Sequence, residues 1–201
     1  MDYQEIFSKK QTFFDRWAPN YDILLTTIFY QAVHKRLLEY VELPESPYIL
    51  DLGCGTGRLL TRLAKQFPDL QGVGVDFSEE MLRQARKQNL DEIRLNYVLG
   101  NAESLPLESA QFDAVFNTIS FLHYPNPEQV FSEIHRALKP QGKYYLADYT
   151  SQQDRFFFPF SPGGLRFYSS QQRQELGERV GLNCVGHYYL LGPVMLTVFE
   201  K

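Results

Sequence analysis

Short apolar runs alternate with amphipathic helical patterns from residue 48 onward. Residues 48–52 form a compact apolar run, and a glycine-rich loop separates them from a helical pattern over 58–67. A second apolar run, 73–76, leads to Ser78, which is a good helix N-cap residue. This order of patterns predicts strand–helix units that follow one another along the chain.

The alternation continues to the end of the chain. Strands are predicted over residues 93–99, 112–117 and 143–149, and helices over 127–138, behind an Asn126–Pro127 cap, and from the Ser169/Gln172 capping box to Gly181. Two last strands, 182–191 and 194–199, are separated only by Gly192 and Pro193. So short a connection predicts an antiparallel pair.

Alternating strands and helices favour right-handed crossovers and a parallel sheet. The predicted fold class is therefore α/β: a Rossmann-like, seven-stranded, mostly parallel sheet with helices on both faces and an antiparallel C-terminal hairpin strand. Ahead of this core, residues 3–42 read as one or two helices interrupted at Pro19. An apolar stripe is expected to face the core there; it comprises Leu24, Ile28, Val33, Leu37 and Leu38.

Composition narrows the class of protein. A length of 201 residues fits a single domain, 1–201, and the net charge of −4, without a cluster of basic residues, argues against nucleic acid as a partner. No apolar run is long enough for membrane insertion, and two cysteines, Cys54 and Cys184, give neither a disulfide framework nor a metal site. We therefore expect a cytoplasmic protein, monomeric or homodimeric.

The candidate binding loop reads Asp-Leu-Gly-Cys-Gly-Thr-Gly over residues 51–57, where the first strand turns into the first helix. Glycine at 53, 55 and 57 would let the backbone adopt positive φ angles and lie against a ligand, with helix amides facing a negative group. Dinucleotide-binding enzymes place a glycine or alanine three residues after the second glycine, whereas this chain has Arg58 there. This difference disfavours NAD as the ligand. The alternative is a loop that serves packing alone.

Asp76 ends the second predicted strand, 19 residues after Gly57. A carboxylate at this place accepts hydrogen bonds from ribose hydroxyls in nucleoside-binding sheets. It therefore indicates an adenosine-containing ligand without choosing between cofactors. A capping or surface aspartate is the alternative.

Four segments resemble, in order and spacing, the motifs of class I S-adenosylmethionine-dependent methyltransferases: ILDLGCGTGRLL, GVGVDFSEEML, GNAESLPL and ALKPQGKYYLADY. The likeness, typical of methyltransferase type 11 proteins, covers residues 48–150 and implies S-adenosyl-L-methionine as cofactor. It assigns the ribose to Asp76, the adenine edge to Asn101 and Ala102, and an adenine face to Phe77. Asn101 replaces the usual aspartate, but its amide oxygen can still accept a hydrogen bond.

The resemblance also implies how the methionine end is held. Asp51 and the Gly53 backbone would bind the ammonium, with help from the carbonyl at Asn117. The segment FDRWAPNYD, 14–22, resembles the lid of quinone-biosynthesis C-methyltransferases, in which Tyr21 would cover the cofactor. Residues 1–46 would then form an N-terminal helical lid over an α/β core of 47–201.

Methyl transfer needs an aligned acceptor more than a nucleophilic side chain, because the sulfonium methyl is already activated. For a hydroxyl or carbon acid, His123 is the best-placed general base, with Tyr21 and Asp148 as substitutes and a loop-packing role as the alternative. Residues 117–120 read Asn-Thr-Ile-Ser, without the Asn/Asp-Pro-Pro-aromatic motif of many nucleic-acid amino methyltransferases. DNA base methylation is therefore disfavoured.

A long aromatic loop, 155–168, follows the fifth strand, where it could line an acceptor pocket or serve packing. The predicted function is methyl transfer to oxygen or carbon of a small molecule, with aromatic and quinone-like compounds among the candidates. The alternatives are an NAD-dependent Rossmann oxidoreductase and a non-catalytic S-adenosylmethionine-binding protein.

Overall fold

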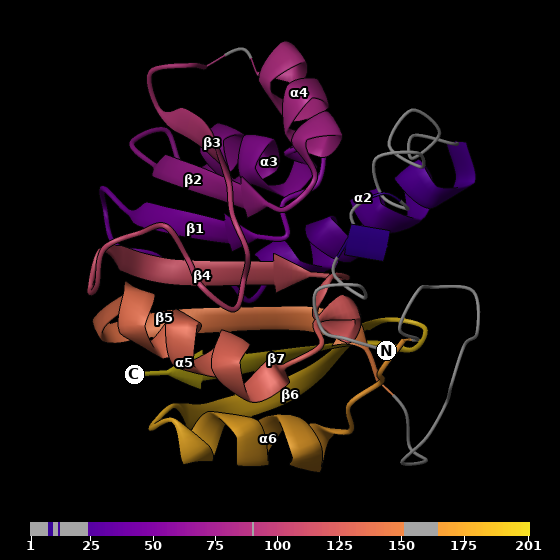
Figure 1. Cartoon of the computed structure of the whole chain (residues 1–201), viewed down its shortest axis with the longest axis vertical. Coiled ribbons are helices and arrows are strands. Elements are labelled where there is room, and N and C mark those ends of the chain that lie inside the picture. The colour runs from indigo at the N-terminus through magenta and orange to yellow at the C-terminus, as the bar shows by residue number, and fades with distance from the viewer. Residues whose placement is uncertain (1–7, 10–11, 13–23, 90, 151–164) are drawn as a thin grey trace.

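The computed structural model describes residues 8–9, 12, 24–89, 91–150 and 165–201. It contains a seven-stranded sheet in the order β3-β2-β1-β4-β5-β7-β6 (Figure 1). The strands are β1 (Tyr48–Leu52), β2 (Gln71–Asp76), β3 (Leu95–Leu99), β4 (Phe112–Thr118), β5 (Leu138–Tyr149), β6 (Asn183–Leu191) and β7 (Val194–Glu200). Neighbouring strands are parallel from β3 through to β5, and β7 is antiparallel to both β5 and β6. The predicted fold class is confirmed.

Helices cover both faces of the sheet. One layer contains α2 (Leu24–Leu38), α3 (Arg58–Gln66) and α4 (Glu79–Gln88), and the other contains α5 (Pro127–Ala137) and α6 (Ser170–Arg179), with the short 3-10 helix η2 (Phe121–His123) beyond β4 (Figure 1). Leu60 and Leu63 of α3 belong to the first buried core, and Phe131 and Ile134 of α5 belong to the second. Side chains from both faces of the strands fill these two cores.

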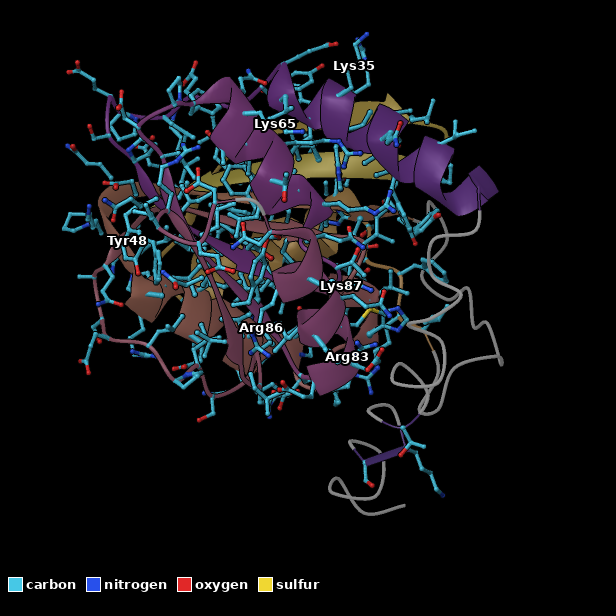
Figure 2. The ribbon with its side chains drawn as sticks, turned by 90° about the horizontal axis from the view of Figure 1, so that it is seen from above. Lys35, Tyr48, Lys65, Arg83, Arg86 and Lys87 are labelled. Atoms are coloured by element: carbon cyan, nitrogen blue, oxygen red, sulfur yellow. The ribbon has the colours of Figure 1, made fainter. Side chains whose placement is uncertain are left out.

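The outward surface of the first helical layer is charged. Figure 2 shows Lys35, Lys65 and Lys87 on α2, α3 and α4, and all three are exposed. Arg83 and Arg86 of α4 pair with acidic residues of the same helix. Among the described residues, no helix is both long and apolar enough to cross a membrane.

Helix ends follow the local sequence signals closely. The Ser78 side chain accepts from the Met81 amide at the start of α4, and the Asn126 side chain accepts from the Gln129 amide at the start of α5. The Ser169/Gln172 capping box is formed in both directions. These contacts confirm the predicted caps, each of which stabilises a helix by about 1 kcal/mol.

Some predicted boundaries are wrong. Ile93 is 94% exposed and precedes β3, because Arg94 pairs with Asp91 in a tight turn that directs Ile93 outward. Ile28 is 55% exposed, although Val33 and Leu37 of the same expected stripe are buried. Pro19 and Leu24's side chain lie outside the described residues.

The fifth strand also begins earlier than predicted. Leu138 already pairs with Phe112, five residues before the expected start at Lys143. Pro140 falls in an irregular part of this ladder, where the register shifts between Phe112 and Ala114. A proline is tolerated at such a bulge although it would break a regular central strand.

Candidate functional site

The glycine loop leaves the carboxyl end of β1 and enters α3. Gly53, Gly55 and Gly57 have φ angles of 69°, 52° and 75°, in the left-handed region that favours glycine. The amides of Gly53 and Cys54 both donate to the Val75 carbonyl, at 2.8 and 3.1 Å. The loop is therefore fixed against β2, beside the end of that strand.

The three glycines differ in what surrounds them. A Cβ at Gly53 would lie 2.4 Å from Ser120 Oγ, and one at Gly57 would lie 2.4 Å from the Tyr97 hydroxyl. A Cβ at Gly55 would meet no described atom within 4 Å. Gly53 and Gly57 thus pack tightly against the protein, whereas the backbone at Gly55 faces open space that could hold a ligand.

Asp76 is buried at the end of β2 and binds the same loop. Its Oδ2 accepts from the Gly55 amide at 2.8 Å, and its Oδ1 accepts from the Ser78 amide at 2.9 Å. The capping alternative is thereby realised, because Oδ1 orders the start of α4. The contact with Gly55 also places the carboxylate directly beside the open part of the loop.

Asp51 lies within β1, beside Phe116 of β4, and is 1% exposed. Neither carboxylate oxygen accepts a hydrogen bond of normal geometry from the described residues. Burial, and then repulsion from Asp76, raise the Asp51 pKa to about 7, while the nearby Leu60 amide of α3 acts in the opposite direction. A buried carboxyl without donors is costly, so this position is suited to a cationic ligand.

Asn117 of β4 is fully buried and joins the loop through its side chain. Its Nδ2 donates to the Leu52 carbonyl and to Ser120 Oγ, both at 2.7 Å, and to the Tyr124 hydroxyl at 3.1 Å. Its Oδ1 accepts nothing among the described residues. The family resemblance predicts a role for the carbonyl at Asn117 but none for Ser120 and Tyr124. Polar residues directly after a buried strand are a sequence signal that could have indicated them.

The segment after β3 also reaches this place. The Gly100 amide donates to the Asp76 carbonyl at 2.9 Å, which brings Asn101 and Ala102 close to the end of β2. Asn101 Oδ1 accepts from the Glu103 amide at 3.0 Å, so the turn role left open for Asn101 is realised. Ala102 is buried in the core under α5, and Phe77 beside Asp76 is half-buried.

His123 ends η2, between Ser120 and Tyr124 in the sequence, and is half-buried. The carboxylate of Asp148, at the end of β5, accepts from the Leu122 amide at 3.0 Å and so holds η2 in place. Burial raises the Asp148 pKa to about 6, and the Arg173 guanidinium opposes that shift. Asp148 therefore orders the segment that carries His123.

Aromatic side chains gather at the carboxyl end of β5. Tyr149 stacks on Phe29 of α2 with ring centroids 6.2 Å apart, and it contacts Phe167 edge-on at 6.3 Å. Residues 151–164 of the expected aromatic loop, and Tyr21 of the expected lid, lie outside the described residues. The described aromatic contacts therefore join α2 to the end of that loop.

The structure brings most of the predicted site residues together. The ends of β1, β2 and β4 carry Asp51, Asp76 and Asn117 around one glycine loop. The unpartnered acceptor atoms of Asp51 and Asn117 suit an ammonium, the open face at Gly55 suits a ligand close to the backbone, and Asp76 suits a ribose diol. These features fit a nucleoside that carries an amino acid.

Comparisons with known proteins agree with this geometry. Residues 49–142 match the family described as a methyltransferase domain. The chain is 36% identical over 148 residues to the demethylmenaquinone methyltransferase of Lactobacillus johnsonii, covering 69% of this chain and 59% of that protein. It is 33% identical over 129 residues to the malonyl-[acyl-carrier protein] O-methyltransferase of a Marinomonas species, covering 64% of this chain and 47% of that protein. The chain spans about half the length of the curated relatives it matches.

Solved structures show the same fold. A chain from the Haloferax volcanii complex between the Trm112 methyltransferase activator and a methyltransferase superposes with a TM-score of 0.83 at 22% identity. The match covers 93% of this chain and 96% of that one. Taken with the sequence matches and the loop geometry, these findings identify residues 49–142 as a methyltransferase domain of the class I fold, the family whose cofactor is S-adenosylmethionine.

Proposed function

We propose that this chain transfers the methyl group of S-adenosylmethionine to oxygen or carbon of a small-molecule acceptor. The observation that carries the proposal is the open glycine loop at Gly55, flanked by the buried Asp51 carboxyl, which lacks donors, and by Asp76. The cofactor supplies an activated methyl group. The protein has to hold it, exclude water and position an acceptor in line with the carbon–sulfur bond.

Each residue has a defined task in this proposal. Asp76 accepts from the ribose hydroxyls, while Asp51, the Gly53 backbone and Asn117 hold the ammonium. The remaining contacts follow the family likeness: Asn101 and Ala102 at the adenine edge, Phe77 at the adenine face, Gly57 at the start of α3, and Tyr21 as a cover within a lid of residues 1–46. If a ribose hydroxyl replaced the Gly55 amide as the donor to Asp76 Oδ2, that amide would become available to the cofactor.

We propose an aromatic or quinone-like acceptor. The support is the layer of Phe29, Tyr149 and Phe167 at the end of β5, together with the likeness to a demethylmenaquinone methyltransferase. Aromatic rings pack against one another in offset-stacked and edge-on arrangements, which a planar aromatic acceptor can join. A malonyl thioester is the competing acceptor, because a malonyl-[acyl-carrier protein] O-methyltransferase is also among the relatives.

Titration and methyl transfer test the proposal together. We expect the protein to bind S-adenosylmethionine and S-adenosylhomocysteine and not NADH, which would instead indicate a Rossmann oxidoreductase. Radiolabelled methyl groups should then pass to a reduced naphthoquinone and not to a malonyl thioester. If the protein binds the cofactor but transfers no label to any compound, including those in a metabolite extract, it is a non-catalytic binding protein.

Replacing His123 by alanine is expected to lower turnover about 100-fold, because a positioned base assists deprotonation of the acceptor. The dissociation constant of S-adenosylhomocysteine should stay within about twofold of the original, since Asp148 holds η2 through the Leu122 amide. The measurement is single-turnover transfer of label across a range of pH. Unchanged turnover in a folded variant would remove His123 from the mechanism.

Replacing Gly55 by alanine is expected to weaken S-adenosylhomocysteine binding at least about tenfold while costing only about 1 to 2 kcal/mol of stability. The new methyl group would stand in the open space over the loop, where no described atom lies within 4 Å. Gly192→Ala is the matched control, because Gly192 has a φ of 54° and equally open surroundings in the β6–β7 turn. Equal binding by the two variants would show that the space at Gly55 is not the cofactor site.

A further inference from the structure

Ser120 and Tyr124 lie against the glycine loop and have no task in the mechanism above. A Cβ at Gly53 would lie 2.4 Å from Ser120 Oγ and 2.7 Å from the Tyr124 hydroxyl. Both side chains are half-buried, at the turn between β4 and α5. Two hydroxyl groups therefore stand directly against the loop backbone at Gly53.

The two hydroxyls share hydrogen bonds with Asn117 and with the end of β1. The contact between Ser120 Oγ and the Tyr124 hydroxyl is 3.2 Å, and Ser120 Oγ donates to the Leu52 carbonyl at 3.2 Å. The Asn117 amide already donates to Leu52 and Ser120 at the shorter distance of 2.7 Å. Because the two Asn117 hydrogens already serve Leu52 and Ser120, the Ser120 hydroxyl can turn away from Leu52, and the Tyr124 hydroxyl can turn away from Ser120, to donate to an external acceptor.

The acceptor that fits these hydrogens best is an anion. Burial raises the pKa of Tyr124, so its hydroxyl stays protonated and can donate. The amides at the start of α3, whose N-cap Gly57 supplies no side-chain acceptor, favour a negative group on the same loop. A free anion would be repelled by Asp51 and Asp76, but an amino acid brings its own ammonium for those carboxylates.

We propose that Ser120 and Tyr124 bind the carboxylate at the amino-acid end of the cofactor. The inference rests on the family's cofactor, S-adenosylmethionine, and adds a donor side to the acceptor side formed by Asp51 and Asn117. A zwitterion then meets carboxyl and amide oxygens at its ammonium and two hydroxyls at its carboxylate. Nucleosides without the amino acid gain nothing from the hydroxyl pair.

Paired ligands isolate this contact. S-adenosylhomocysteine and 5′-methylthioadenosine share the adenosine and the thioether, and only the first carries an amino acid. We expect Tyr124→Phe and Ser120→Ala each to raise the dissociation constant of S-adenosylhomocysteine about tenfold, as for a lost hydrogen bond to a charged group. The constant for 5′-methylthioadenosine should change less than about twofold, and Ser120→Thr should restore most of the affinity. Calorimetric titration of the full chain gives both constants.

Tyr144→Phe is the matched control, because the Tyr144 hydroxyl is buried under α5 without a hydrogen-bond partner among the described residues. It should bind both ligands as the original protein does. If Tyr124→Phe and Ser120→Ala weakened the binding of both ligands equally, the two residues would only shape the loop, and the proposal would be wrong. Unchanged affinity for S-adenosylhomocysteine would also contradict the proposal. If the unaltered protein binds neither ligand, the cofactor itself is wrong, which is a different failure.

Discussion

Replacing Arg173 by methionine is expected to lower the free energy of unfolding by about 3 to 5 kcal/mol, as when one partner of a buried charged network is removed. Arg173 is 1% exposed. Its guanidinium donates to four backbone carbonyls, those of Tyr168, Met195, Asp148 and Tyr149, at 2.9 to 3.3 Å. Methionine fills similar volume but leaves those carbonyls without these donors and removes the cation beside the Asp148 carboxyl.

Arg179→Met is the matched control on the same helix. Arg179 is 61% exposed, and its partner Glu128 is exposed as well, so its loss should cost less than about 1 kcal/mol. Thermal and urea unfolding measure both variants, and the expected fall in Tm for Arg173→Met is about 6 to 20 °C for a domain of this size. A Tm within about 2 °C of the original would show that the four contacts contribute little.

The role of Arg173 was beyond prediction from the sequence. The Ser169/Gln172 capping box located α6 correctly, because a capping box depends on residues three apart. Inside that helix an arginine reads as a surface residue. Its burial follows from carbonyls on β5, β7 and the segment before α6, which only the assembled sheet brings together.

The strands show the same division between local and long-range causes. The bounds of β1 were predicted residue for residue, since a short apolar run ends at a glycine loop. The start of β5 at Leu138 was missed, because it is set by pairing with Phe112 across the sheet. Ile93 was wrongly included in β3, because hydrophobicity alone does not reveal that the Asp91–Arg94 turn directs it outward.

At the site, residue types and spacing predicted that the glycine loop and Asp76 would meet, and the family resemblance added Asp51. Gly55 and Asp76 follow from the ends of two parallel strands beside a loop that needs positive φ angles. Ser120 and Tyr124 were missed, because their importance depends on a 3.2 Å contact between them and on the shape of the loop they touch. Contacts of this kind leave no periodic pattern in the sequence.

Replacing Asp51 by asparagine is expected to stabilise the cofactor-free protein and to weaken cofactor binding. The folded protein raises the Asp51 pKa from 3.8 to about 7. A raised pKa favours the folded state at low pH, and that contribution is lost as pH rises from about 4 through 7. At pH 8 the variant should therefore be more stable by roughly 2 to 4 kcal/mol, with no difference expected near pH 4.

Unfolding measured from pH 4 to pH 8 tests this dependence. The Asp148 pKa of about 6 makes both proteins less stable over the same range, so the difference between them reports Asp51. Asp69→Asn, at an exposed position before β2, is the control for replacing a carboxylate. Parallel curves for the original protein and Asp51→Asn would contradict the assignment of a raised pKa to Asp51.

Binding should change in the opposite direction to stability. The ammonium needs an ionised Asp51, so the original protein must release a proton when it binds S-adenosylhomocysteine below pH 7, and its affinity should fall about tenfold per pH unit there. Asp51→Asn should lose about 3 kcal/mol or more of binding at pH 8, over 100-fold, and show no such slope. Titrations in buffers of different ionisation enthalpy count the protons released. If the asparagine variant gained stability and kept its affinity, the buried charge would serve neither folding nor cofactor binding. If it gained stability and lost affinity, the buried Asp51 carboxylate destabilises the fold because cofactor binding requires it.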